Sequence, residues 1–253
     1  MIKKSYILRL CPILAAALLF SSCVPLSGDD GKSPQDLINE KISAADTGVD
    51  GFYDIPAVCS SFEEIFDGIQ SLGNTEGIYL DQFENKCVGF FNTYQLMAED
   101  ADEAISVIGS IFSIETSESL SQLAHGAGNT VPLAVSEDEL LDVISVVSQD
   151  YSSFASLSSE NSYFTAGKHT HDDYAKKIET ALFKLNGAFD LYRGGGGDDG
   201  EPGAFKKLVA EALSAMSDVA MMHSETLEIM SADSEMVFTL IDKMKTYIPQ
   251  TFD

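Results

Sequence analysis

The sequence is poor in basic residues. Its 253 residues include 15 Lys and Arg against 40 Asp and Glu, which gives a formal net charge of -25. A protein that binds nucleic acid generally needs a face of Lys and Arg to neutralise phosphates, so this composition excludes a general nucleic-acid binder. Hydrophobic residues make up 45% of the chain, which is enough for a packed core in spite of the charge.

The first 23 residues have the pattern of an export signal. Lys3, Lys4 and Arg9 form a positive segment, and the apolar run that follows, residues 13–20, is too short to span a bilayer comfortably. The run ends in Phe20-Ser21-Ser22-Cys23, which resembles the lipobox of bacterial lipoproteins. Ordinary secretion with cleavage nearby is the alternative interpretation.

The resemblance to bacterial lipoproteins covers only these opening residues, and it implies that residues 1–22 are removed and that Cys23 is acylated. Two or three acyl chains would hold the protein stably on a membrane. Val24 follows the cysteine in place of Asp, which by the enteric sorting rule implies transport to the outer membrane of the cell envelope. Residues 23–34 then form a flexible tether, because they are rich in Pro, Gly, Ser and Asp.

Removal of the signal makes the chain more acidic. Residues 1–22 carry three basic residues and no acidic one, so the mature charge is -28. An acidic body beside an anionic membrane is repelled from the lipid surface, which favours outward presentation. Any protein partner recognised by charge should therefore have a basic surface.

Four cysteines become two in the mature body. Cys11 leaves with the signal and Cys23 is assigned to the lipid, so Cys59 and Cys87 remain. Both lie 14 residues from Gly73, the expected apex of a helical hairpin. In an oxidising envelope this placement predicts a disulfide, worth roughly 3 to 4 kcal/mol in the chain-entropy model. Two buried free thiols are the alternative.

Apolar spacing is helical almost everywhere between residues 35 and 253. The only extended candidate is Thr130 to Val135, where Pro132 favours a connection. The sequence therefore predicts an all-α protein, an elongated antiparallel bundle of about five main helices in a single domain. The expected helices cover residues 58–72, 77–113, a segment from Ser136 to Phe154, a segment from Thr170 to Tyr192 and a segment from Pro202 to Pro249, with a short helix over Pro34 to Ala44.

No set of residues predicts catalysis, and no cofactor is expected. The densest group of potential metal ligands is His169, His171 and Asp172, which could hold zinc or copper. These residues lie at an expected helix start, however, where acidic side chains favour the helix dipole and alternate residues do not converge. The favoured interpretation is a helix terminus and not a metal site.

The sequence favours a lipid-anchored envelope protein that acts by binding and is not an enzyme. A structural lipoprotein that holds envelope components at a fixed distance is one alternative. Another is a carrier of a small apolar ligand, in which aromatic residues of the second helix line a cavity: Phe83, Phe90, Phe91 and Tyr94.

Overall fold

The computed structural model describes residues 31–45, 54–111, 137–194 and 203–247. These residues form α-helices and no strand, so the prediction of an all-α antiparallel bundle is confirmed. The helices are α1 (Pro34–Ala44), α2 (Ile55–Leu72), α3 (Leu80–Ile111), α5 (Glu137–Ser158), α6 (Ser162–Thr165), α7 (His171–Arg193) and α8 (Ala204–Tyr247).

The five main helices match the five expected from the apolar pattern, with ends that differ by a few residues. The sequence did not predict α6, which is a single turn of four residues. Thr130 to Val135 and Pro202 lie outside the described residues, so their predicted roles stay predictions.

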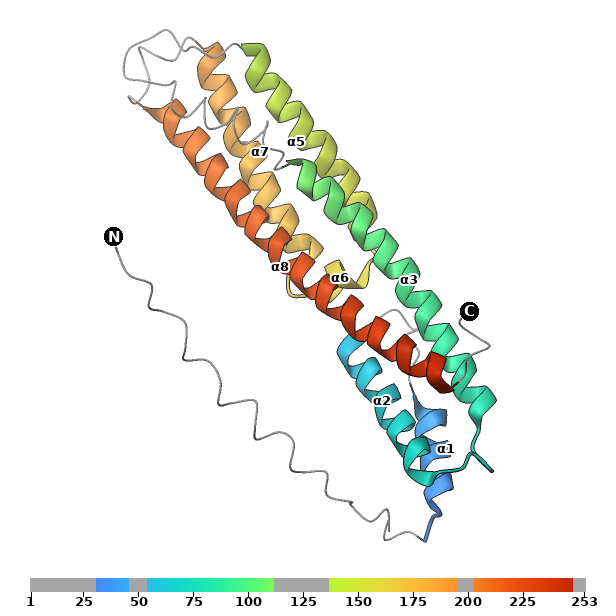
Figure 1. Ribbon diagram of the computed structural model, residues 1–253. Helices are drawn as coiled ribbons and strands as arrows, with labels where there is room; N and C mark the ends of the chain where they lie inside the picture. Colours follow the sequence, from blue (N-terminus) through green and yellow to red (C-terminus); the bar gives the residue numbers. More distant parts are fainter. Residues whose placement is uncertain (1–30, 46–53, 112–136, 195–202, 248–253) are drawn as a thin grey trace, which may run out of the picture.

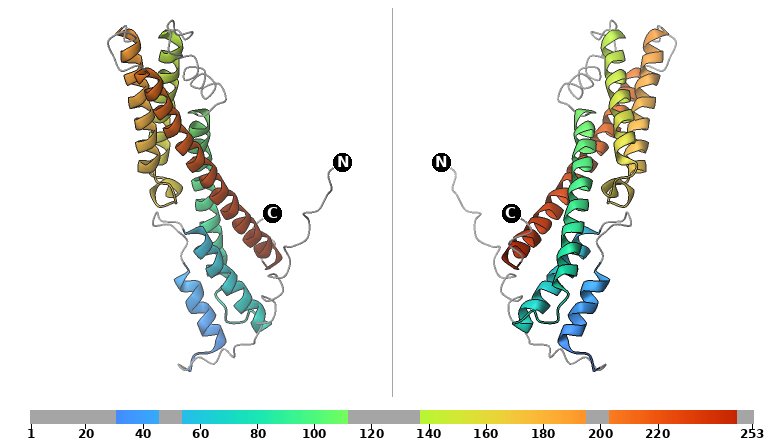
Figure 2. Two further views of the ribbon diagram at one scale, coloured as in Figure 1. Left: turned by 90° about the vertical axis from the view of Figure 1, so that its left-hand side faces the viewer. Right: turned by 90° about the vertical axis from the view of Figure 1, so that its right-hand side faces the viewer.

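Two long helices, α3 and α8, extend into both halves of an elongated molecule (Figure 1). At one end they pack with α5 and α7, and at the other with α1 and α2. The side views show the same division into two helical groups that share α3 and α8 (Figure 2). We call these groups the α5–α7 half and the α1–α2 half. With 44 residues, α8 is about 66 Å long at 1.5 Å per residue.

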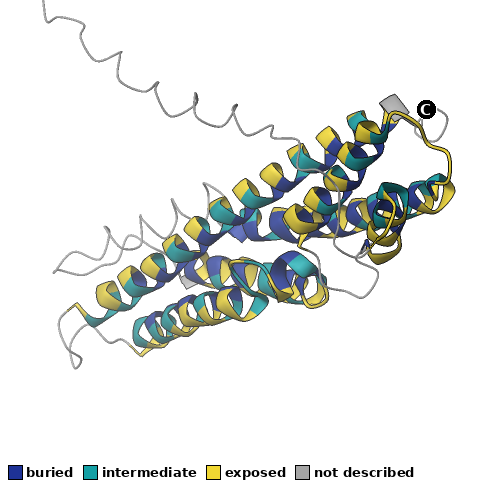
Figure 3. Cartoon of the chain, turned by 90° about the horizontal axis from the view of Figure 1, so that it is seen from below, coloured by how far each residue is buried: buried dark blue, intermediate teal, exposed yellow. Residues whose placement is uncertain are grey.

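Each helix buries one face and exposes the other. On α2 the buried stripe is Val58, Phe62, Ile65 and Ile69, with steps of three and four residues. Seen from below, the buried surfaces of the helices face one another and the exposed surfaces face outward (Figure 3). Burial of these apolar stripes is the main favourable contribution to folding.

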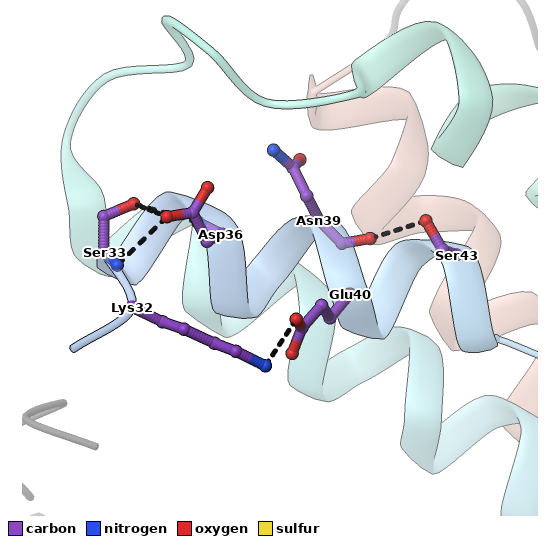
Figure 4. Close-up of polar contacts among 6 residues, drawn as sticks. All are labelled: Lys32, Ser33, Asp36, Asn39, Glu40 and Ser43. Atoms are coloured by element: carbon purple, nitrogen blue, oxygen red, sulfur yellow. Dashed lines mark hydrogen bonds and ion pairs between the residues drawn. The ribbon is translucent and has the colours of Figure 1, made fainter. Parts of the chain in front are cut away.

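Hydrogen bonds at the helix ends fix where α1 and α7 begin. At the start of α1 the Asp36 backbone amide donates to Ser33 Oγ, and the Ser33 amide donates to the Asp36 carboxylate (Figure 4). Thr170 and Asp173 form the same reciprocal pair at the start of α7. Both arrangements are capping boxes, which satisfy amides that have no partner within the helix.

Asn39 ties α1 to the connection between α2 and α3. Its side chain is buried, donates to the Gly77 carbonyl at 2.8 Å and accepts from the Tyr79 amide at 2.9 Å. Gly77 has a φ of 79°, a conformation that favours glycine. The short helix is therefore held in place by specific polar contacts as well as by its apolar face.

The predicted disulfide is wrong: Cys59 and Cys87 are both buried free thiols. The connection is not centred on Gly73, because α2 ends at Leu72 and α3 begins only at Leu80. Cys59 lies 13 residues before the end of α2, and Cys87 lies seven residues after the start of α3. Their levels along the helix pair therefore differ by about 9 Å, whereas a disulfide needs Cα atoms about 4.4 to 6.8 Å apart.

Candidate functional site

Cys23, the predicted lipidation site, lies outside the described residues. Within the described helices, none combines the length and the apolar character that a membrane span requires. Membrane attachment through Cys23 therefore stays a prediction.

The predicted metal-ligand candidates contact different partners. The His169 ring pairs with the Glu225 carboxylate on α8, and Lys168 reaches the same carboxylate at 2.8 Å. The Nδ1 atom of His171 lies 2.6 Å from the Ser158 hydroxyl, which also contacts the Phe154 carbonyl of α5 at 2.7 Å.

Asp172, the third candidate, lines an open groove on α7. Among the residues that the structure describes, no group of three or more His, Cys, Asp and Glu side chains could hold a metal ion. The arrangement agrees with the favoured interpretation of this segment as a helix terminus, since Thr170 and Asp173 cap α7 here.

The aromatic residues suggested for a ligand cavity pack against one another in the core. Phe62 of α2 meets Phe83 and Phe90 of α3 with ring centroids 5.8 and 5.5 Å apart, and Phe90 meets Tyr94 at 6.4 Å. Phe91 is half-buried and packs against the same core. These rings fill the space between α2 and α3, which is the ordinary role of aromatic side chains in a helical core.

A buried polar cluster lies where the two halves of the rod meet, and the sequence analysis did not identify it. At its centre is Asp233 of α8, which is only 6% exposed. The Tyr163 hydroxyl of α6 donates to the Asp233 carboxylate at 2.9 Å. Tyr94 of α3 lies beside Tyr163 and beside Ser234, the neighbour of Asp233. We call Asp233, Tyr163 and Tyr94 the junction cluster.

The short helix α6 holds this cluster in position. Its N-cap residue, Asn161, accepts from the Tyr163 amide and donates its side-chain NH₂ to the Met97 carbonyl of α3 at 2.9 Å. Asn161 and Tyr163 are both buried. Thus α6 is fixed to α3 through Asn161 and to α8 through Tyr163.

The N-terminal end of α2 brings further acidic groups to the junction cluster. Burial raises the pKa of Asp233, the hydrogen bond from Tyr163 opposes that shift, and the charge of Asp54 raises the pKa further. Burial, with the charges of Glu63 and Asp233, raises the pKa of Cys59 to about 12. Both pKa shifts favour the protonated forms of these groups.

An acidic residue within an apolar stripe is the sequence feature that could have revealed the junction cluster. Thr226, Met230, Asp233, Val237 and Leu240 follow one another on α8 at steps of three or four, and all are buried. A carboxyl group at such a position needs a buried partner. The sequence could not give Tyr163 as that partner, because it lies 70 residues away on a helix that was not predicted.

Open grooves on the surface provide the candidate binding sites. One, of about 480 Å³, runs along α7 and is lined by Asp172, Lys176, Glu179, Thr180 and Phe183 together with Ala175. The Phe183 ring is 73% exposed. A second groove, of about 640 Å³, lies between α1 and Tyr79, where Lys32 pairs with Glu40 at 2.6 Å (Figure 4).

The charges in the two grooves have different surroundings. In the α1 groove Asp36 is occupied by its capping hydrogen bonds and Glu40 by its ion pair. In the α7 groove Glu179 accepts a hydrogen bond from Tyr151 of α5 at 2.9 Å. The α7 groove combines a highly exposed ring with charged side chains, which makes it the better candidate for contact with another macromolecule.

Comparison of the chain with protein-family models, curated proteins and solved structures found no match.

Proposed function

We propose that this chain is a lipid-anchored protein of the bacterial cell envelope that acts by binding another macromolecule. Acylated Cys23 would attach it to a membrane, and residues 24–34 would form the tether. The outer membrane is the expected location. The protein acts as a binding module and not as an enzyme.

The observation that carries this proposal is the position of α1. Its first residue, Pro34, is the last residue of the expected tether, and α1 lies at the end of the rod opposite the tips of α5 and α7 (Figure 1). An anchor attached at that end would leave the length of α8, about 66 Å, for surfaces held away from the membrane. Charge repulsion between the acidic body and anionic lipid would favour the same orientation.

The α7 groove is the proposed contact surface. Phe183 offers an exposed apolar anchor, and carboxylates at Asp172 and Glu179 lie along the same face. With a mature charge of -28, the protein would associate fastest with a partner of positive surface potential.

Two experiments test the two parts of this proposal. For the anchor, mass spectrometry of the N-terminal peptide from native membranes should find acylated Cys23, and Cys23→Ala should move the protein out of the membrane fraction. An unmodified N-terminus at another residue would contradict the anchor.

For the groove, a photo-reactive amino acid at position 183 should give a discrete protein adduct in intact cells. The same group at Phe238 of α8, which is 60% exposed and is not among the groove's lining residues, is the matched control. Equal adduct patterns at both positions would contradict a specific contact at α7.

A structural spacer is the second candidate, and the unbroken length of α8 favours it. A single helix of 44 residues that contacts both halves would keep the rod ends at a fixed separation. The function of a spacer depends on the length of the rod, whereas the function of a binding module depends on its contact surface. Phe183→Ala should therefore abolish the function of a binding module and leave that of a spacer intact.

A further inference from the structure

We propose that Asp233 is a proton-dependent latch between the two halves of the rod. With Asp233 neutral, α2 and α6 are held against α8; with Asp233 ionised, these contacts loosen. This inference does not depend on the proposed binding function, because it concerns groups inside the fold.

The first argument is the position of Asp233. It lies on α8, which contacts both α2 and α7, and groups from each side of the junction lie near it. Tyr163 approaches from α6, and Asp54 and Cys59 approach from the start of α2. A change at this carboxyl group therefore acts where the two halves meet.

The second argument is the charge of its surroundings. Among the described residues, the titratable groups that face Asp233 are Asp54 at the N-cap of α2, Cys59 of α2, Tyr94 of α3 and Tyr163 of α6. Each of these four groups is neutral or negative in all its protonation states, so none can neutralise an ionised Asp233.

The charged groups that lie next to these four residues do not provide a counter-ion for Asp233 either. Glu63 lies near Cys59 and is already paired with Lys243 at 2.8 Å, and Asp102 lies near Tyr94. An ionised carboxylate in the junction cluster would therefore rely on hydroxyl donors, chiefly Tyr163 at 2.9 Å. Such a buried charge without a counter-ion is costly, and opening the junction to water removes the cost.

The direction of the pH dependence follows from proton linkage. Burial raises the pKa of Asp233 in the closed junction, whereas an opened junction exposes the group to water, where an aspartate has a pKa of about 3.9. The closed state thus binds the proton more tightly. Between the two pKa values the opening equilibrium should rise by up to about tenfold per pH unit, and above the pKa of the closed state it should level off.

Hydrogen–deuterium exchange of the full chain at a series of pH values tests this latch, after correction for the intrinsic pH dependence of exchange. Peptides covering residues 54–60 and 161–166 should lose protection by up to about tenfold per pH unit above pH 4. In Asp233→Asn, which keeps an oxygen acceptor for Tyr163, the same peptides should stay protected at all pH values. Glu228→Gln, on the exposed face of α8, should behave like the wild type.

A wild-type protection that does not change with pH, or that changes equally in Asp233→Asn, would overturn the latch. A second measurement uses only the wild-type protein, so the proposal can still be tested if Asp233→Asn fails to fold. The side-chain carboxyl carbon of Asp233, followed by NMR, should titrate with a midpoint above about 3.9, and a midpoint at or below that value would also overturn the proposal.

Discussion

The two halves of the rod contain helix pairs that are packed with side chains of different size. In the α1–α2 half, Phe62 and Phe66 of α2 meet Phe83 and Phe90 of α3, with ring centroids 4.9 to 5.8 Å apart. In the α5–α7 half, α7 packs closely against α8, although the rings of Phe154, Phe164 and Tyr174 are also buried there with centroids 5.3 to 5.9 Å apart. Small residues make the close packing of α7 against α8 possible, and all of them are buried: Ala181, Ala188, Ala212 and Ala215.

This difference predicts which kind of substitution each half tolerates. A core filled by large rings loses most when a ring is removed, because the surrounding helices can close only part of the cavity. A seam of alanines loses most when a side chain is enlarged, because the helices must move apart. Substitutions of opposite type should therefore be the sharpest tests of the comparison.

The largest effect is expected for Phe62→Ala. This ring is fully buried and makes edge-on contacts with both Phe83 and Phe90. Its removal should lower the free energy of unfolding by about 3 to 5 kcal/mol, measured by urea denaturation. Phe183→Ala, at a ring that is 73% exposed, is the control and should change it by less than about 0.5 kcal/mol. Equal effects would contradict the assignment of Phe62 to the core.

The next effect concerns the junction cluster between the halves. Tyr163→Phe removes the hydroxyl that donates to Asp233 and leaves a buried carboxyl oxygen without that partner. At neutral pH this should cost about 1 to 3 kcal/mol of unfolding free energy.

The cost of Tyr163→Phe should also depend on pH. The hydroxyl holds down a pKa that burial raises, so its loss raises the pKa of Asp233 further. A raised pKa means stability that is greatest at low pH and is lost as pH rises through the folded-state value. The variant should therefore approach the wild type in stability below about pH 4 and fall behind as the pH rises. A loss of stability in Tyr163→Phe that is independent of pH would contradict a role for the ionisation of Asp233.

Ala212→Leu tests the small-residue seam. Ala212 is fully buried on α8, and three added carbon atoms should cost about 1 to 3 kcal/mol by forcing α7 and α8 apart. Ala232→Leu, at an exposed position of the same helix, adds the same atoms without that strain. If both variants are equally stable, the close approach of α7 and α8 does not depend on residue size.

The sequence could predict elements whose evidence is local. Phe62 and Cys87 belong to apolar stripes with helical spacing, and Thr170 with Asp173 forms a capping box within four residues, so these helices were expected correctly. The disulfide prediction was wrong because it depended on the register between α2 and α3. The start of α3 at Leu80 shifts that register.

The junction cluster could not be predicted for a related reason. Tyr163 and Asp233 are joined only by the folding of α6 against α8, and α6 is too short to have an apolar period of its own. The acidic residue in the apolar stripe of α8 could have indicated that a buried partner was needed, but not which residue it is. The spacing of apolar residues therefore predicts helices but not the contacts between segments that are distant in the sequence.

The smallest effect is expected for the ion pairs along the outside of the α7–α8 seam. Lys177 lies 2.6 Å from Asp218, and Lys184 lies 2.7 Å from Glu211. Because Lys177 and Asp218 are each about two-fifths exposed, water and salt screen the pair, and a double-mutant cycle with Lys177→Met and Asp218→Asn should give a coupling of only about 0.2 to 1 kcal/mol.

The salt dependence of that coupling completes the test. A screened surface pair should lose most of its coupling between low salt and about 1 M salt, where the Debye length falls to about 3 Å. A coupling that survives high salt would mean that the pair is shielded from solvent and helps to hold α7 to α8 at any ionic strength. The contrast between the halves would then lie in charge as much as in side-chain size.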